Sequence, residues 1–148
     1  MKLFQTTLFI ALLTLTVSSF ATGGDFQRVA APIRGGWELA SRYGEDYIHL
    51  FPDFETIGAP ELKIYISKAP IVTLNDDNAL FRSEELGALG NREGEQWLRV
   101  PEDVDVKRYQ TIFLYSDYFK KLWAVSKIKV DDEAYKQTRR RVYQGRSF

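Results

Sequence analysis

The chain has 148 residues, 45% of them hydrophobic, and its 20 lysines and arginines balance its 20 aspartates and glutamates. A formal net charge of zero provides no overall field to draw the chain to nucleic acid or to an anionic membrane. The chain contains no cysteine, one methionine and one histidine, so it can form no disulfide and offers few soft ligands to a transition metal.

Residues 1–21 have the layout of a secretory signal peptide. Lys2 precedes an apolar run over residues 8–17, and Ser19 and Ala21 supply the small side chains before a cut. The apolar run is about 10 residues, shorter than the roughly 20 that a membrane-spanning helix needs. We therefore expect cleavage after Ala21, no stable membrane insertion afterwards, and an exported protein, periplasmic or extracellular, with one domain.

The next residues indicate β-structure. Residues 22–34 are interpreted as an N-terminal extension. Residues 36–42 and 47–51 are apolar-rich runs around a turn that contains glycine, which predicts a hairpin. In residues 62–66, Leu62, Ile64 and Ile66 alternate with Lys63 and Tyr65, which is the period-two pattern of a strand with one buried face.

The middle of the chain alternates loops and strands. Residues 69–80 contain a proline and a cluster of Asn and Asp, which favour turns over a sheet ladder. Residues 84–89 and 96–100 flank a short connection bounded by glycines and predict a second hairpin. Residues 101–109 predict a brief helical turn with an Asp cap.

Residues 111–115 are apolar on both faces, as expected of a central strand covered on both sides. Alternation resumes over residues 124–130. Together these patterns predict an all-β domain over residues 35–130, an antiparallel sandwich or flattened barrel of about eight strands. Residues 131–148 run from acidic to basic, and we expect either a short C-terminal helix or a solvated tail there.

Several landmarks follow one another in a particular order. They are Gly36-Trp37-Glu38, Asp53-Phe54-Glu55-Thr56, Gly58, Pro60, Leu62, Tyr65, Leu86-Gly87, Gly94-Glu95-Gln96-Trp97, Pro101-Glu102-Asp103-Val104-Asp105, Tyr109, Tyr115-Ser116-Asp117-Tyr118-Phe119 and Leu122-Trp123. Their order and spacing resemble the DM-thirteen domain, a small all-β module found alone in exported bacterial proteins and beside DOMON domains in animals. The resemblance implies an association with electron transfer.

Two positions depart from that family's pattern: Gly58-Ala59-Pro60 carries one residue more than the Gly-Pro turn of the family, which affects only local geometry, and Ser116 bears on function. The resemblance implies a cysteine, the family's proposed redox group, where this chain has Ser116. A serine hydroxyl has no accessible redox couple, whereas a thiolate oxidises reversibly. We therefore expect an electron-transfer role to act through a bound partner or a cofactor of unknown identity, and none of the chain's own side chains is expected to hold that cofactor.

Aromatic side chains gather in the last third of the domain. The candidate binding residues are Trp97, Tyr115, Tyr118, Phe119 and Trp123. They can fill the core, offer a stacking platform to a sugar or cofactor ring, or provide a path for electrons. Lys120 and Lys121 place the adjoining loop in water, so a partly exposed pair of Tyr118 and Trp123 is the predicted binding element. The alternative function is a non-catalytic binding or scaffolding module of the cell envelope that recognises a glycan or a protein.

The sequence indicates no catalytic residue and no metal site. His49 has no second His, Met or Cys with which to share a haem or copper, and no Gly-x-Ser-x-Gly elbow supports a Ser-His-acid triad. Asp76-Asp77-Asn78 and Asp131-Asp132-Glu133 lack the spacing of an EF-hand loop, so turns and helix capping explain them more simply than calcium. Arg139-Arg140-Arg141 is interpreted as a solvated face or a contact for an anionic partner. The sequence favours a binding protein over an enzyme.

Overall fold

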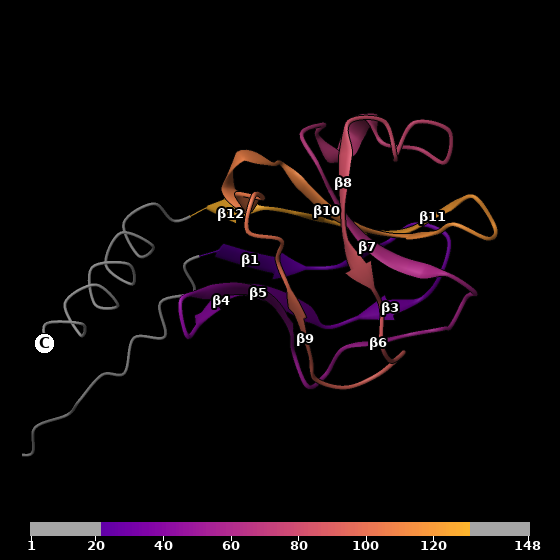
Figure 1. Cartoon of the computed structure of the whole chain (residues 1–148). Coiled ribbons are helices and arrows are strands. Elements are labelled where there is room, and N and C mark those ends of the chain that lie inside the picture. The colour runs from indigo at the N-terminus through magenta and orange to yellow at the C-terminus, as the bar shows by residue number, and fades with distance from the viewer. Residues whose placement is uncertain (1–21, 131–148) are drawn as a thin grey trace, which may run out of the picture.

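The computed structural model describes residues 22–130, and these form an all-β sandwich (Figure 1). The predicted fold class is therefore confirmed. Eight strands have four residues or more: β1 (Thr22–Asp25), β4 (Gly36–Arg42), β5 (Glu45–Leu50), β7 (Leu62–Ser67), β8 (Ser83–Ala88), β9 (Gln96–Arg99), β10 (Thr111–Ser116) and β11 (Lys121–Lys127). Four strands have two: β2 (Gln27–Arg28), β3 (Ile33–Arg34), β6 (Glu55–Thr56) and β12 (Lys129–Val130). The predicted signal peptide and C-terminal helix lie outside the described residues.

The strands form two five-stranded antiparallel sheets and a two-stranded ribbon. The first sheet has the order β12-β1-β4-β5-β9, the second β2-β11-β10-β7-β8, and the ribbon pairs β3 with β6. Alternate side chains of the two sheets meet in one apolar core, which includes Ile48, Ile64 and Ile112. Within this core the Trp37 indole N–H of β4 donates a 2.9 Å hydrogen bond to the Ser126 hydroxyl of β11. The bond joins the two sheets.

The second sheet is covered on its outer face as well. Residues 69–82, which include the 3-10 turn η1 (Ile71–Thr73), lie over it, and Tyr65, Phe113 and Leu122 pack with Ala79 in a second apolar cluster. Asp76 fixes this cover because its carboxylate accepts hydrogen bonds from the Lys121 ammonium and the Leu122 amide, each 2.8 Å long. The same two bonds hold the pKa of Asp76 below its ordinary value. The burial of β10 on both faces follows, as its sequence predicts.

Residues 22–34 are part of the sandwich, so their interpretation as an extension is wrong. They contain β1, β2 and β3, and β1 lies between β12 and β4 in the first sheet. Gly23 and Gly24 carry no side chains and so give the strand no hydrophobic period. Gly23 is needed there because a Cβ would lie 2.4 Å from the Trp37 carbonyl oxygen.

The second predicted hairpin is also wrong. β8 is at the edge of the second sheet and β9 is at the edge of the first, so the chain crosses between the sheets from one to the other. A short connection bounded by glycines suits either arrangement, and the partner strands decide between them. The helical turn predicted over residues 101–109 is confirmed as η2 (Val106–Arg108), with the Asp105 carboxylate accepting from the Lys107 amide.

Candidate functional site

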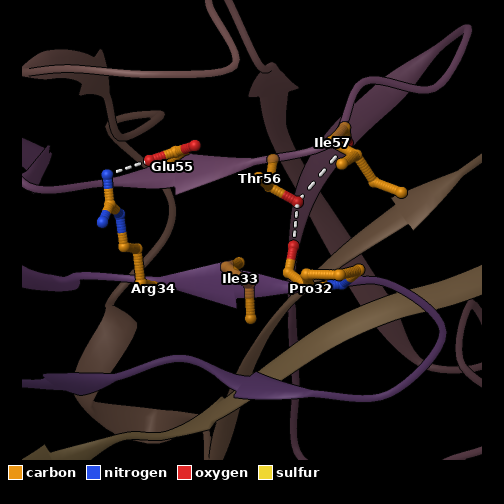
Figure 2. Close-up of a pocket in the computed structure, with 6 residues that line it drawn as sticks. All are labelled: Pro32, Ile33, Arg34, Glu55, Thr56 and Ile57. Carbon is orange, nitrogen blue, oxygen red and sulfur yellow. Dashed lines mark hydrogen bonds and ion pairs between the residues drawn. The ribbon is translucent and has the colours of Figure 1, made fainter.

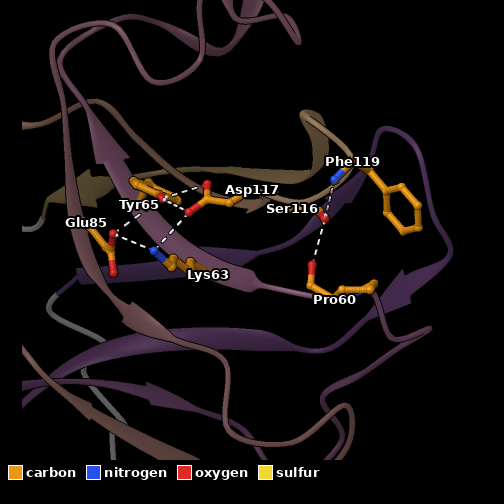
Figure 3. A network of polar contacts seen from close by, with 7 residues as sticks. All are labelled: Pro60, Lys63, Tyr65, Glu85, Ser116, Asp117 and Phe119. Atoms are coloured by element: carbon orange, nitrogen blue, oxygen red, sulfur yellow. Dashed lines mark hydrogen bonds and ion pairs between the residues drawn. The ribbon is translucent and has the colours of Figure 1, made fainter.

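Three connections meet at one end of the sandwich, at the right of Figure 1. They are residues 29–34, 55–60 and 116–121, and we call this region the hairpin end. The Ser116 hydroxyl donates a 2.8 Å hydrogen bond to the Pro60 carbonyl and accepts one from the Phe119 amide (Figure 3). The Val29 amide donates to the Trp123 carbonyl on β11, and the Thr56 hydroxyl donates to the Pro32 carbonyl. Hydrogen bonds therefore hold the three connections together.

The hairpin end exposes large apolar side chains. Tyr118 is 64% exposed, Phe119 52% and Ile57 53%. The rings of Tyr118 and Phe119 meet edge to face, with centroids 5.0 Å apart and planes at 83°. The aromatic pair is therefore a protruding contact and does not present a flat platform.

A pocket of about 210 Å³ lies in the ribbon formed by β3 and β6 (Figure 2). It is lined by Pro32, Ile33, Arg34, Glu55, Thr56 and Ile57. The Thr56 hydroxyl donates to the Pro32 carbonyl at 3.0 Å, and the Arg34 guanidinium pairs with the Glu55 carboxylate. Apolar walls beside one ion pair suit the apolar side chain of a partner better than a charged group.

Trp123 is buried, so the expected exposed pair with Tyr118 is wrong. Its side chain is 8% exposed. The register between β10 and β11 shifts at Leu114 and Tyr115, and this bulge leaves Trp123 without a cross-strand partner. Trp123 and Ala124 consequently both join the inner core. The bulge could not be recognised from the alternation of one strand.

The Trp123 indole lies behind the pocket. Its N–H approaches the Thr56 hydroxyl oxygen and the Ile57 carbonyl oxygen, each at 3.2 Å. Both acceptors belong to residues that line the pocket. Trp123 therefore supports the hairpin end from inside the core.

The other predicted binding residues separate. Tyr115 is 3% exposed beneath residues 69–82, where its hydroxyl donates to the Asp76 carbonyl. Trp97 is half-buried on the outer face of the first sheet. Of the predicted set only Tyr118 and Phe119 share an exposed surface. Ile57 was not among the predicted residues, and its only signal in the sequence is an apolar residue beside Gly58 in a turn.

A charged cluster fixes the base of the β10–β11 hairpin (Figure 3). Asp117 accepts hydrogen bonds from the Tyr65 hydroxyl and the Lys63 ammonium, each 2.9 Å, and Lys63 also reaches Glu85 at 3.0 Å. Burial pushes the pKa of Asp117 upward, but the bonds from Lys63 and Tyr65 outweigh it and lower the pKa. Burial and the Asp117 bond raise the pKa of Tyr65. Each charged group of this cluster forms a hydrogen bond or an ion pair within it, and these contacts hold Asp117 beside Ser116.

Ser116 is fully buried, and we expect Ser116→Ala to lower the free energy of unfolding by about 1–3 kcal/mol. Alanine would leave the Pro60 carbonyl and the Phe119 amide without their partner. Urea denaturation measures the loss. Ser41→Ala is the matched control, because the Ser41 hydroxyl bonds to Asp46 at the surface, and it should change stability by less than about 0.5 kcal/mol. Equal losses would contradict the anchoring role of Ser116.

His49 forms a second cluster on the outer face of the first sheet. Its two ring nitrogens lie 2.8 Å from a Glu38 carboxylate oxygen and 2.8 Å from a Glu95 carboxylate oxygen. The ring stacks on Trp97 with centroids 3.8 Å apart, and the Arg42 guanidinium lies 3.3 Å from the Trp97 centroid. Cross-strand register brings these residues together, since His49 pairs with Glu38 on β4 and Trp97 on β9.

Within residues 22–130 no three His, Asp or Glu side chains are grouped so as to hold a metal ion. The same residues include no helix with the length and apolar character needed to cross a membrane. Comparison of the chain with protein families, curated proteins and solved structures found no match.

Proposed function

We propose that this chain is an exported binding module of the DM-thirteen type that docks a protein of the cell envelope through its hairpin end. The observation that carries the proposal is the exposure of Tyr118 and Phe119 on a turn whose base is hydrogen-bonded to buried Ser116. Aromatic side chains are enriched in protein interfaces, and a rigid support reduces the conformational entropy that they lose on binding.

The ring geometry favours a protein partner over a glycan. A sugar ring stacks on a flat aromatic face, whereas Tyr118 and Phe119 stand at 83° to each other. Two rings in that arrangement fit an apolar depression on a protein. The pocket lined by Ile57 can in turn receive an apolar side chain of the partner.

In this proposal any electron transfer depends on the docked partner. Ser116 stands where the resemblance implies a redox cysteine, and here its hydroxyl positions the docking surface. A redox group would then be carried by the partner, or by a cofactor bound between partner and module. The proposal requires no catalytic side chain in this chain.

Site-specific photo-crosslinking tests the docking surface. A photoreactive phenylalanine analogue placed at position 119 should give a covalent adduct with an envelope protein in intact cells. Position 43 is the matched control, because Tyr43 is 98% exposed at the tip of the β4–β5 hairpin, at the opposite end of the sandwich (Figure 1). Recovered protein beginning at Thr22 would support export. Equal labelling from both positions, or none from position 119, would refute the docking role.

A further inference from the structure

His49, the only histidine of the chain, is held between two carboxylates. Glu38 and Glu95 contact its two ring nitrogens, and the His49 side chain is 12% exposed. A neutral imidazole has one N–H donor and one lone pair, so it can donate to only one carboxylate. Both contacts become hydrogen bonds from an N–H only when the ring carries two protons.

The groups that face the ring come from several strands. The charged ones are Glu38 on β4, Glu95 just before β9 and, across the Trp97 ring, Arg42 on β4. The Phe51 ring adds an uncharged edge contact. Further across the first sheet, Glu38 pairs with Gly23 of β1, and Gly23 pairs with Lys129 of β12. Two carboxylates therefore approach the imidazole directly, whereas the Arg42 guanidinium lies against the Trp97 ring.

Glu95 belongs to a connection that pairs with the pocket wall. In residues 90–95, the Arg92 carbonyl accepts a 2.8 Å bond from the Thr56 amide, and the Gly94 amide donates at 2.8 Å to the Phe54 carbonyl. Glu93 also pairs with Glu55 in a β-bridge. Residues 90–95 therefore link β6, through backbone hydrogen bonds, to the His49 cluster, through Glu95.

We propose that His49 and Glu95 form a proton-dependent tie that sets the rigidity of the pocket at the hairpin end. While the ring carries both protons, Glu95 holds residues 90–95 against the first sheet. When the ring loses a proton, one carboxylate faces a lone pair. Glu95, 50% exposed against 28% for Glu38, is then the one that exchanges its contact for water. The tie is complete while the ring carries both protons and Glu95 is ionised, and it is lost when the ring releases one proton.

The inference rests on the proposed function, because it assigns a regulation to the same docking site. Partner binding should strengthen as the surroundings acidify, since a rigid pocket loses less conformational freedom on docking. An exported protein experiences the pH outside the cytoplasm, so the tie would respond to external acidity.

Nuclear magnetic resonance on the whole chain as isolated from cells tests the tie without the partner. Nitrogen shifts of the single imidazole report its protonation state as the pH is changed. Amide exchange, normalised to unstructured peptide rates at each pH, reports the Thr56 and Gly94 bonds. We expect their protection to fall about tenfold as the ring loses its proton, which corresponds to the loss of one charge-assisted hydrogen bond.

Two variants separate the tie from general charge effects. In Glu95→Gln the carboxamide can accept from a ring N–H or donate to a ring lone pair, so protection should stay constant across the titration. Glu93→Gln removes the same charge from the same connection without touching His49 and should keep the wild-type dependence. Constant protection in the wild-type chain, or an unaltered dependence in Glu95→Gln, would overturn the tie. Neither result alters the crosslinking test at position 119, so the two proposals can fail separately.

Discussion

Replacing Trp37 with alanine is expected to lower the free energy of unfolding by about 3–5 kcal/mol. Trp37 is fully buried between the two sheets, and its indole N–H donates to the Ser126 hydroxyl at 2.9 Å. Alanine would leave a cavity at the centre of the core and remove the donor that Ser126 uses. Urea unfolding followed by far-ultraviolet circular dichroism measures the difference.

Two further variants divide this loss. Trp37→Phe keeps most of the apolar volume and removes only the donor, so its cost should be about 1–3 kcal/mol. Trp97→Ala truncates an indole that is half-buried on the outer face of the first sheet, and it should cost less than Trp37→Ala. If truncating Trp97 were the more damaging change, the arrangement of the two faces of β4, β5 and β9 would be wrong.

Local chemistry explains the elements that the sequence predicts correctly. The first hairpin depends on a turn that Tyr43 and Gly44 form with positive φ angles of 52° and 83°, and neighbouring residues alone determine it. Strand β10 was recognisable because burial on both faces leaves no charged residue in its sequence and apolar side chains from Ile112 to Tyr115. In both cases the signal and its cause lie within a few residues.

The elements that the sequence misses depend on distant partners. β1 carries Gly23 because the Trp37 backbone approaches closely, and this approach has no local signature. Leu86 of β8 and Leu98 of β9 both pack against the same core, although their strands belong to different sheets. Local pattern therefore shows that such strands are buried on one side but not which sheet each one joins.

The candidate site also has features that local sequence predicts and features that depend on distant partners. The exposure of Tyr118 could be predicted from the lysines that follow it, because a turn with consecutive charges faces water. The pocket could not, since Arg34 and Glu55 meet only through the pairing of β3 with β6. The two carboxylates at His49 likewise depend on the register of β4, β5 and β9.

Trp123→Ala is expected to lower the free energy of unfolding by about 3–5 kcal/mol, comparable to the loss at Trp37. Trp123 is 8% exposed in the core, and alanine would remove both its packing and the N–H that reaches Thr56 and Ile57. The bulged position of β11 would then have no large side chain to pack in the core. Chemical denaturation measures the loss.

A loss of partner binding in Trp123→Ala would not identify Trp123 as a contact residue, because the docking surface rests on it. Trp123→Phe separates the two roles. It keeps an aromatic ring in the core and removes the donor, with an expected cost of about 1–3 kcal/mol. The Ser116 bonds to Pro60 and Phe119 do not involve Trp123, so crosslinking from position 119 should persist in this variant. If crosslinking disappeared while the protein stayed folded, the docking surface would depend on the N–H bonds from Trp123 to Thr56 and Ile57. A wild-type stability for Trp123→Ala would show that the side chain is not buried in the core.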